Sequence, residues 1–519
     1  MIQELRLSLH PAEGFDRENL EKYIRKQLQL EDSDQLYIDL KKRSIDARGR
    51  SVKVNVYADA YVNEPSKPKE NVHIDYKQIS NSKEVIVVGA GPAGLFAALK
   101  LIELGLKPIV IERGKNVRDR RRDLAAINKE HIVNPDSNYC FGEGGAGTYS
   151  DGKLYTRSNK RGNIRSVLDT FFSHGAVEEI LIDTHPHIGT NKLPGIIVSM
   201  RETILHFGGE IHFNTKVTDF IIQNDKIKGV KCNGDITITA DALILATGHS
   251  ARDIYEILHK SNVYLEFKPF ALGVRAEHPQ ELIDSIQYHC DLRGEYLPPA
   301  SYALVEQVQG RGVYSFCMCP GGIIAPCATS PGEIVTNGWS PSKRNNPFAN
   351  SGIVVEIKDE DLKDFAQFGP LAGMYFQQAI EQASCAAAGG TQKAPAQRMV
   401  DFCNGKTSSS LGLTSYKPGI ESLNLSEILP KAVGDRLQKA FPVFGQKMRG
   451  YYSNEAILHA VESRTSTPVR IPRHIETLQH EQIAGLFPCG EGAGYAGGIV
   501  SAAMDGQKCA EAVAQFLTS

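Results

Sequence analysis

This sequence has almost no net charge, no C-x-x-C pair of cysteines and no long apolar run. The 519 residues carry 58 Lys and Arg against 60 Asp and Glu, so a net charge of −2 gives no general attraction to nucleic acid or to an anionic membrane surface. No stretch reaches the about 18 uninterrupted apolar residues of a membrane span. The residues from Met1 to Arg6 lack the apolar core of a signal peptide. Ten cysteines are scattered without a C-x-x-C pair. We therefore expect reduced thiols, no membrane segment and a cytoplasmic location.

The length implies two or three domains, because one hydrophobic core does not extend over 519 residues. Strand-like alternation at 2–9, 35–40 and 51–62, with a capped helical pattern at 16–28, predicts a small α+β module over residues 1–65. The polar residues 66–82 are typical of a linker.

A basic run in this first module, Lys41-Lys42-Arg43 with Arg48 and Arg50, allows two interpretations. It could contact RNA or an acidic partner. Alternatively it is a solvated strand edge, which is the more common situation for such a run.

The stretch from Val85 to Gly94 carries the strongest signal in the chain. Four β-branched apolar residues predict a buried parallel strand, and the glycines that follow predict a tight turn into a helix. In a G-x-G-x-x-G turn the first glycine permits the turn, the second lets a pyrophosphate approach, and the third lets helix and strand pack closely. A second apolar run at 108–111 ends in Glu112, whose carboxylate is expected to accept both ribose hydroxyls. The predicted dinucleotide ligands here are Gly89, Gly91, Pro92, Ala93, Gly94, Glu112 and Arg113.

A second glycine-rich segment spans 142–152, where five glycines in eleven residues do not favour ordinary helix or strand. Such a backbone can lie flat against a planar or charged group, and beside a dinucleotide site the candidate is an isoalloxazine ring. The alternative is a flexible loop. The predicted contacts are Gly145, Ala146, Gly147 and Thr148.

The segment from 208 to 248 predicts a short strand, a three-stranded meander and a buried strand that ends in Ala246-Thr247-Gly248. This order resembles flavoproteins of the glutathione-reductase type. The resemblance implies FAD rather than a nicotinamide cofactor alone, and it implies that the backbone of Val217 meets the adenine.

Residues 266–450 differ in composition and pattern from the preceding segment. They contain short alternating runs rich in Gly, Pro and Asn, followed by a helical pattern at 371–388. We predict an inserted, β-rich α+β domain that covers the flavin. Cys317 and Cys319 are expected on one face of a strand. A redox pair is one interpretation, but such positions bridge badly, which favours two buried thiols.

The C-terminal segment, 451–519, returns to the nucleotide fold with a last strand, a glycine-rich turn and a helix from 500 to 516. In the FAD superfamily a Gly-Asp pair at this place holds the ribitol, and here the pair is Gly490-Glu491. The start of the helix is expected to offer N–H groups to the flavin edge that gains negative charge on reduction. The predicted contacts are Gly490, Glu491, Gly497, Gly498 and Ile499.

Five segments together resemble a bacterial family of FAD-dependent proteins labelled "NAD(FAD)-utilizing dehydrogenase". They are the first glycine motif with Glu112-Arg113-Gly114, the run 142–154, Leu245 to Asp253, Val461 to Ser466, and the Gly490 segment. The resemblance spans nearly the whole chain and implies FAD without a settled substrate. The expected fold class is therefore α/β: a Rossmann-like FAD domain with a three-stranded meander, an inserted domain and the small N-terminal module.

The leading hypothesis is an FAD-dependent oxidoreductase that exchanges a hydride between flavin N5 and an organic substrate. The alternatives are a flavin monooxygenase and an RNA-associated flavoprotein that uses the basic N-terminal module. NAD(P)H is expected only as a transient electron donor at the flavin face, because residues 113–519 contain no second strand–glycine–helix unit. No metal site is expected. The partner is a small-molecule substrate rather than nucleic acid or membrane, and the sequence does not determine the oligomeric state.

Four side chains stand on segments expected to approach the flavin ring: Lys153, His249, Arg464 and Tyr495. Each has a structural alternative. These are a surface ion pair for Lys153, a helix cap for His249, a domain-packing salt bridge for Arg464 and a cover over the flavin edge for Tyr495.

Overall fold

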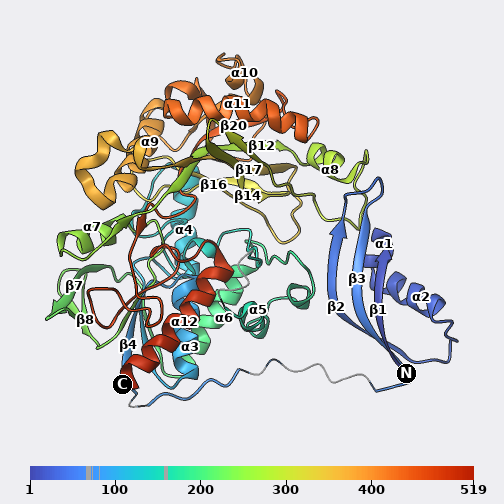
Figure 1. Ribbon diagram of the computed structural model, residues 1–519, viewed down its shortest axis with the longest axis horizontal. Helices are drawn as coiled ribbons and strands as arrows, with labels where there is room; N and C mark the ends of the chain where they lie inside the picture. The colour runs from blue at the N-terminus through green and yellow to red at the C-terminus, as the bar shows by residue number, and fades with distance from the viewer. Residues whose placement is uncertain (66–71, 73, 81, 157–161, 519) are drawn as a thin grey trace.

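A computed structural model of the chain describes residues 1–65, 72, 74–80, 82–156 and 162–518. Three parts are distinct in Figure 1: a small N-terminal sheet that stands to the right, a parallel sheet with its helices at the lower left, and a larger mixed sheet above them. The predicted linker, 66–82, lies partly outside the described residues.

The N-terminal module contains an antiparallel sheet in the order β1-β3-β2 with two helices on one face. Its core is formed by alternating apolar residues such as Leu5, Val54 and Val56, which meet Leu20 and Ile24 of the second helix. The predicted strands and helix are confirmed. Their bounds are β1 Ile2–Leu9, α1 Pro11–Phe15, α2 Arg17–Gln27, β2 Leu36–Asp46 and β3 Lys53–Val62.

The edge of β2 joins this module to the rest of the chain. The backbone N–H of Arg43 donates to the carbonyl of Ile182 at 3.1 Å, and the N–H of Thr184 donates back to Arg43 at 3.0 Å. The Arg43 guanidinium pairs with Asp183, with 2.8 Å between Nε and Oδ1. The edge strand is thus covered rather than left open.

The nucleotide-binding unit is built on a five-stranded parallel sheet in the order β22-β10-β4-β5-β6. Helices α3 and α12 pack side by side on one face (Figure 1), and they approach so closely that a Cβ on Gly506 would lie 2.1 Å from the carbonyl oxygen of Ala93. The elements are β4 Glu84–Val88, α3 Pro92–Glu103, β5 Lys107–Ile111, α4 Val117–Lys129, α5 Ile164–Ser173, α6 Leu193–His206, β6 Glu210–His212, β10 Leu243–Leu245, α7 Arg252–Lys260, β22 Leu486–Pro488 and α12 Ile499–Thr518.

The predicted meander is confirmed as an antiparallel three-stranded sheet between β6 and β10. Its strands are β7 Val217–Gln223, β8 Lys226–Cys232 and β9 Ile236–Thr239.

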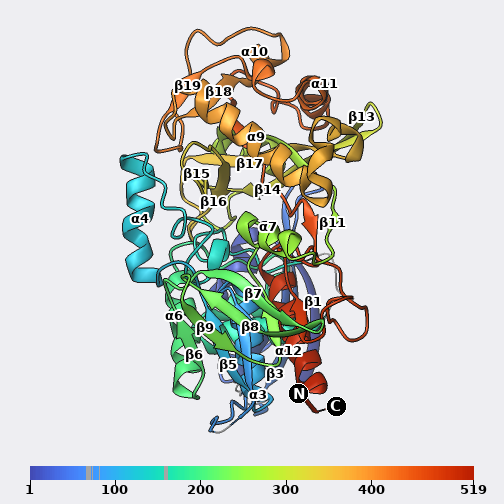
Figure 2. The ribbon, with the colours of Figure 1, turned by 90° about the vertical axis from the view of Figure 1, so that its left-hand side faces the viewer.

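The inserted domain, as we use the term, is the seven-stranded sheet in the order β13-β14-β17-β12-β20-β18-β19 with its covering helices. Figure 2 shows α9, α10 and α11 on the side of this sheet that faces away from the nucleotide-binding unit. The strands are β12 Phe270–Pro279, β13 Val305–Val308, β14 Arg311–Cys319, β17 Phe348–Ile357, β18 Ala394–Arg398, β19 Ile420–Ser422 and β20 Ile457–Glu462. The helices are α8 Gln280–Tyr288, α9 Ala372–Ala387, α10 Met399–Cys403 and α11 Lys431–Lys447.

One boundary of this domain differs from the sequence-based expectation. Strand β20 pairs with β12 and β18, so the sheet continues beyond the predicted boundary at residue 450. A separate hairpin consists of β15 Ile323–Pro326 and β16 Thr336–Trp339. A short antiparallel pair, β11 Glu266–Phe267 with β21 Val469–Arg470, lies where the chain enters and leaves the domain.

No helix among the described residues is both long enough and apolar enough to cross a membrane.

Candidate active site

A cavity of about 450 Å³ lies where the nucleotide-binding unit meets the inserted domain. Its wall is formed by the turn after β4, the first residues of α3 and α12, and the glycine-rich segment 145–153. The segment before α7 and residues of β14 and β16 complete the wall. Ligands of open α/β sheets bind at this end of the strands, outside their carboxyl ends.

Most of the residues predicted to bind FAD line this cavity, although they come from six separate segments. Those on its wall are Gly89, Gly91, Pro92, Ala93, Glu112, Arg113, Gly145, Ala146, Gly147, Val217, Ala246, Thr247, Gly248, Glu491, Gly497, Gly498 and Ile499. Gly94, Thr148 and Gly490 lie behind the wall. Thr148 donates its hydroxyl to the carbonyl of Glu143 at 2.6 Å, and the N–H of Gly490 donates to Asp505 at 2.7 Å.

The glycines of the first motif serve different purposes. Gly89 has a φ of +104°, and a Cβ there would lie 2.4 Å from the carbonyl oxygen of Ala246. A Cβ on Gly94 would lie 1.9 Å from the carbonyl oxygen of Gly89. A Cβ on Gly91 would instead point into open space, with its first neighbour, the Cα of Gly145, at 3.9 Å. Two of the glycines are therefore required by the fold, whereas Gly91 leaves room for a ligand.

The cavity receives the N-termini of two helices. Helix α3 begins after Gly91 with Pro92 in its first turn and has no side-chain cap. Helix α12 begins at Ile499, preceded by Gly497 and Gly498, where a Cβ would meet no heavy atom within 4 Å. Uncapped N–H groups and the positive end of the helix dipole favour anions such as phosphate.

Glu112 occupies the position at the end of β5 that was predicted to accept the ribose, but its carboxylate has three backbone partners. Oε2 accepts the N–H of Ala90 at 2.9 Å, and Oε1 accepts those of Gly114 and Gly142, each at 2.9 Å. A carboxylate offers about four lone-pair sites. Space remains on Oε2 for a hydroxyl, and the expectation that Glu112 accepts the ribose hydroxyls stays a prediction.

Arg113 also has protein partners. Its guanidinium donates to the Asp253 carboxylate, with 2.9 Å between NH1 and Oδ1, and lies over the ring of Phe141. The pKa of Asp253 is lowered despite burial because Arg113 and Lys216 lie beside it. Arg113 thus ties the cavity wall to α7.

Two of the four candidate catalytic residues form pairs at the cavity. Lys153 donates to the carbonyl of Met318 and lies 3.6 Å from Asp151 Oδ2. Burial opposes its charge, but the thiols of Cys319 and Cys317 and the Asp151 carboxylate raise the pKa of Lys153. His249 Nδ1 lies 3.4 Å from Glu491 Oε1, and His249 is not the cap of α7, whose N-cap is Ala251.

Tyr495 does not line the cavity. The guanidinium groups of Arg470 and Arg473 lie 4.9 and 3.8 Å from its ring centroid, and its hydroxyl accepts the N–H of Arg473. It supports the turn before α12 and is not placed to touch a ligand in the cavity.

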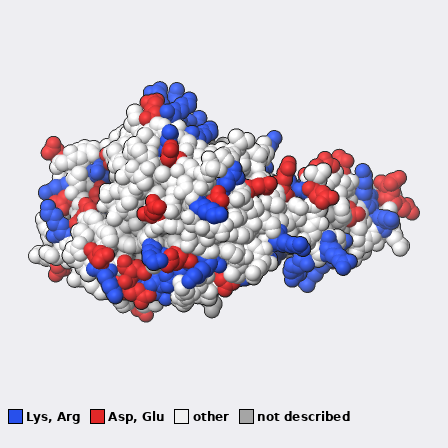
Figure 3. All heavy atoms as spheres, turned by 90° about the horizontal axis from the view of Figure 1, so that it is seen from above, with Lys and Arg blue, Asp and Glu red and all other residues white. Residues whose placement is uncertain are grey.

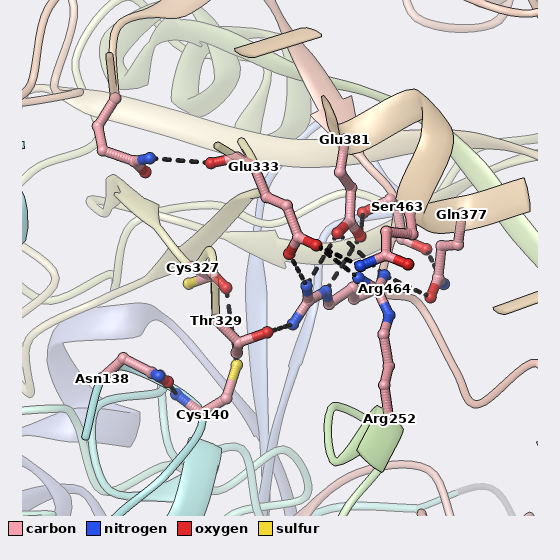
Figure 4. A network of polar contacts seen from close by, with 12 residues as sticks. Asn138, Cys140, Arg252, Cys327, Thr329, Glu333, Gln377, Glu381, Ser463 and Arg464 are labelled. Carbon is pink, nitrogen blue, oxygen red and sulfur yellow. Dashed lines mark hydrogen bonds and ion pairs between the residues drawn. The ribbon is translucent and has the colours of Figure 1, made fainter. Parts of the chain in front are cut away.

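Arg464 reaches the cavity wall but is bound in a buried network (Figure 4). Its Nε and NH2 donate to the two oxygens of Glu381 at 3.0 and 2.9 Å, NH2 contacts Glu333 at 3.2 Å, and NH1 donates to Thr329 at 2.7 Å. Arg252 of α7 donates to the same two carboxylates. This matches the domain-packing alternative, since the network joins α7 to the inserted domain.

Burial and the two guanidinium groups affect the two carboxylates of this network differently. Burial and the charge of Glu381 raise the pKa of Glu333. Burial acts on Glu381 in the same direction, but Arg252 and Arg464 lower its pKa to about 2.

Sequence reasoning missed the aromatic part of the wall. Tyr139, Tyr149 and Phe316 line the cavity together with Trp339, the single tryptophan of the chain. The ring centroids of Tyr139 and Trp339 are 4.7 Å apart, although 200 residues separate them in sequence. No local pattern brings these rings together, because the contact exists only when the inserted domain folds back.

Asp151 and Cys317 were also missed as cavity residues. The run Ser150-Asp151-Gly152-Lys153 did carry a signal, because an acid and a base flank a glycine beside the second glycine-rich segment. Cys317 was predicted to share a strand face with Cys319. The strand is irregular there, because Cys317 has a φ of +46° and the pairing of β14 with β17 shifts register between Phe316 and Cys319, but the two thiols still lie beside each other.

One group of potential metal ligands occurs among the described residues, formed by Cys489, Asp505 and Cys509. Arg473 already occupies this place, with NH2 2.6 Å from Asp505 Oδ1 and NH1 3.4 Å from Cys509 Sγ. A cation there would meet the guanidinium charge. The expectation of no metal site stays a prediction.

Comparison with known proteins gives matches along the whole chain. A family model described as "Pyridine nucleotide-disulphide oxidoreductase" matches residues 83–266, and one described as "FAD-dependent protein, C-terminal domain-like" matches residues 269–465. A domain of unknown function matches residues 1–61. A Clostridium beijerinckii protein, described as uncharacterized, is 41% identical over 98% of this chain and 97% of its own length.

The chain belongs to the family of that protein. With the two matched domain models, this family membership makes the protein an FAD-dependent oxidoreductase with a Rossmann-like FAD-binding fold. The predicted fold class, cofactor and enzyme class are confirmed.

Other matches are weaker. A digeranylgeranylglycerophospholipid reductase of Methanosarcina acetivorans is 26% identical over 28% of this chain and 32% of its own. Among solved structures, a geranylgeranyl bacteriochlorophyll reductase-like protein of Thermoplasma acidophilum is 13% identical. It aligns over 84% of this chain and 80% of its own, with a TM-score of 0.36.

Proposed function

We propose that this enzyme exchanges a hydride between its FAD and a small organic substrate held in the cavity beneath the inserted domain. The observation that carries the proposal is the composition of the cavity wall. One side consists of glycine turns and two helix N-termini, and the other side consists of aromatic rings and a few polar groups. The finer family label, "NAD(FAD)-utilizing dehydrogenase", agrees with this proposal.

The residues present fit FAD. We assign the pyrophosphate to the open space at Gly91 before α3, one ribose hydroxyl to Glu112 Oε2, and the adenine to the backbone near Val217. The ring is assigned to the segment 145–147 and the start of α12, where Gly497 and Gly498 leave open space. When bound, FAD supplies hydride exchange at N5.

The chain's own contribution is to orient the substrate and exclude water. Trp339 and Tyr139 close the cavity from the inserted domain and from the loop before Phe141. An apolar wall with a few polar groups suits a small, largely apolar molecule. The described residues form one parallel sheet with a glycine turn, so NAD(P)H, if it is the donor, binds transiently in this same cavity and competes with the substrate.

Contacts in the N-terminal module do not support the RNA-binding alternative. Lys41 lies 2.5 Å from Asp39, Arg43 pairs with Asp183, and Arg48 pairs with Asp46. Figure 3 shows acidic and basic side chains interspersed over this face of the molecule. RNA binding that is sensitive to salt and that disappears when residues 1–65 are deleted would favour this alternative.

A matched pair of glycine variants tests the cofactor assignment. Gly91→Val places its side chain in open space, so the protein should fold and lose FAD. Gly94→Ala collides with the backbone of Gly89, so it should impair folding itself. FAD released by denaturation is quantified, and circular dichroism reports the fold. A folded Gly91→Val protein with normal FAD content would show that the pyrophosphate lies elsewhere.

Anaerobic reduction tests the reaction. Bleaching of the bound flavin by NADH or NADPH, followed by reoxidation with an organic acceptor, is expected for the proposed reaction. Quenching of Trp339 fluorescence by bound flavin provides a signal for occupancy, with Trp339→Phe as its control. Consumption of oxygen coupled to hydroxylation of the acceptor would instead favour the monooxygenase.

A further inference from the structure

Strand β14 is interrupted by a bulge where it reaches the cavity. Residues 317 and 318 are unpaired between the partners of Phe316 and Cys319, and Cys317 adopts a φ of +46°. That region is unfavourable for residues other than glycine. Bulges redirect side chains and occur next to active sites. Here the side chain at position 317 lies at the cavity wall.

Three donors hold the backbone of this bulge. NH1 of the fully buried Arg275 donates to the carbonyl of Cys317 at 3.2 Å, and the thiol of Cys319 donates to the same oxygen at 3.3 Å. Lys153 donates to the carbonyl of Met318. Arg275 is itself fixed by Glu462, with 2.8 Å between Nε and Oε2. The unusual conformation at position 317 is therefore maintained by Cys319 of the same strand and by Arg275 and Lys153 from two other segments.

The charges around the Cys317 sulfur favour a thiolate. The Cys319 thiol beside it, together with Lys153 and Arg275, lowers the pKa of Cys317 well below that of an ordinary thiol, against the effect of burial. Asp151, which also faces it, acts the other way. In the same protein, burial raises the pKa of Cys232 to about 11 and that of Cys403 to about 12.

A second, independent observation at this end of the cavity points to a ligand. The side chain of Asp151 is 3% exposed, and its Oδ2 accepts a hydrogen bond from Arg344 at 2.9 Å. Its Oδ1 is buried without any hydrogen-bond partner, although Asp151 lines the cavity. An ionised carboxylate is an acceptor only, and a buried unpaired oxygen is costly. Oδ1 is therefore suited to an N–H or O–H group of a bound molecule.

We propose that Cys317 is the proton-transfer residue of this enzyme and that Asp151 Oδ1 binds the amino group of the substrate beside it, with one N–H directed to Asp151 and another to Cys317. This inference rests on the proposed function and narrows it to substrates that carry an amino group on the carbon that exchanges the hydride.

The proton balance is simple in the direction of substrate oxidation. One N–H bond of the substrate breaks, and its proton forms an S–H bond with the Cys317 thiolate, while the other N–H stays hydrogen-bonded to Asp151 Oδ1. The electron pair of the broken bond stays on the substrate and forms its new double bond to carbon, as the hydride leaves that carbon for FAD. Substrate reduction reverses each of these changes.

Alkylation of the purified protein by iodoacetamide over a range of pH, with each cysteine followed by peptide mass mapping, tests the thiolate. Only the thiolate reacts, so Cys317 should react at acidic pH, where Cys327, a cavity cysteine whose pKa burial raises, is inert. Lys153→Met should slow the reaction of Cys317 at acidic pH by at least about tenfold and move its pH midpoint upward. Lys115→Met is the matched control, because Lys115 pairs with Asp123 away from the cavity.

An alkylation midpoint typical of an ordinary thiol, unchanged in Lys153→Met, would overturn the proposal. This readout needs neither FAD nor substrate, so its failure is distinct from a failure of the proposed function, which FAD content decides.

The role in turnover is tested with Cys317→Ser and Cys317→Gly. Glycine tolerates the positive φ, so Cys317→Gly keeps the bulge while it removes the sulfur. Anaerobic flavin bleaching is measured with a panel of small benzylic amines, with the matching benzylic alcohols for comparison. Both variants should hold normal FAD and bleach at least about a hundredfold more slowly, a loss within the range for a proton-transfer residue. The acidic limb of the pH profile should disappear. Bleaching by Cys317→Gly at the rate of the parent protein would exclude Cys317 from the reaction.

Discussion

Glu112 in the nucleotide-binding unit and the buried carboxylates Glu381 and Glu462 in the inserted-domain half of the molecule are held in different ways. In the first, the carboxylate of Glu112 accepts backbone N–H groups from three separate turns. In the second, side chains of opposite charge are buried against each other, as in the pair of Arg275 with Glu462 and the pair of Arg464 with Glu381. Backbone donors leave the cavity wall free for a ligand. In the buried ion pairs the guanidinium groups donate only to other groups of the protein, and these contacts fix the position of the domain that covers the cavity.

The largest expected effect comes from breaking a buried ion pair of the inserted domain. Arg464→Met leaves Glu333 and Glu381 with one guanidinium between them, and removal of one buried partner typically lowers the free energy of unfolding by about 3–5 kcal/mol. Urea unfolding measures the loss. The control is Arg48→Met, because that arginine side chain is 90% exposed in its pair with Asp46 and its removal should have little effect. Equal effects of the two variants would contradict the contrast between the two regions.

Acid should destabilise the inserted domain through His278. Burial lowers the pKa of this imidazole from 6.5 to about 4, although its hydrogen bond to the carbonyl of Tyr451 acts in the opposite direction. The unfolded chain therefore binds a proton that the folded chain does not. The contribution of the neutral ring is complete above pH 6.5 and is lost as the pH falls toward 4, a total of about 3 kcal/mol.

The His278→Gln variant tests this directly. Its free energy of unfolding should change less than that of the parent protein between pH 6.5 and 4. The same slope in both proteins would assign the acid sensitivity to other groups.

A smaller effect is expected in the nucleotide-binding unit, from Glu112→Ala. The variant leaves three backbone N–H groups without their acceptor, at a cost of about 1–3 kcal/mol if water from the cavity replaces part of the bonding. FAD should also bind more weakly. Stability is measured by urea unfolding of the apoprotein, and affinity by titration with FAD. Weaker FAD binding at unchanged stability would show that the three hydrogen bonds contribute little.

The separation of contacting residues along the chain explains what could be predicted from the sequence. The turn at Gly89 to Gly94, the strand that ends in Glu112 and the meander were predictable, because their constraints act between residues that are close in sequence. The contact of Tyr139 with Trp339 and the network of Arg464 join distant segments, so local patterns do not contain them. The bulge at Cys317 could not be found because its cause lies in Arg275 and Lys153, on other elements.

The order of the parallel sheet has a consequence for synthesis of the protein. Strand β22, at residues 486–488, and helix α12, which follows it, complete a sheet and a helix layer whose first members, β4 and α3, are made about 400 residues earlier. Helix α3 is buried along almost its whole length, in part against α12. On the ribosome its apolar surface has no permanent partner until the last segment emerges, and such exposed surface invites aggregation. We therefore expect the nascent chain to depend on chaperones and to mature only after its release.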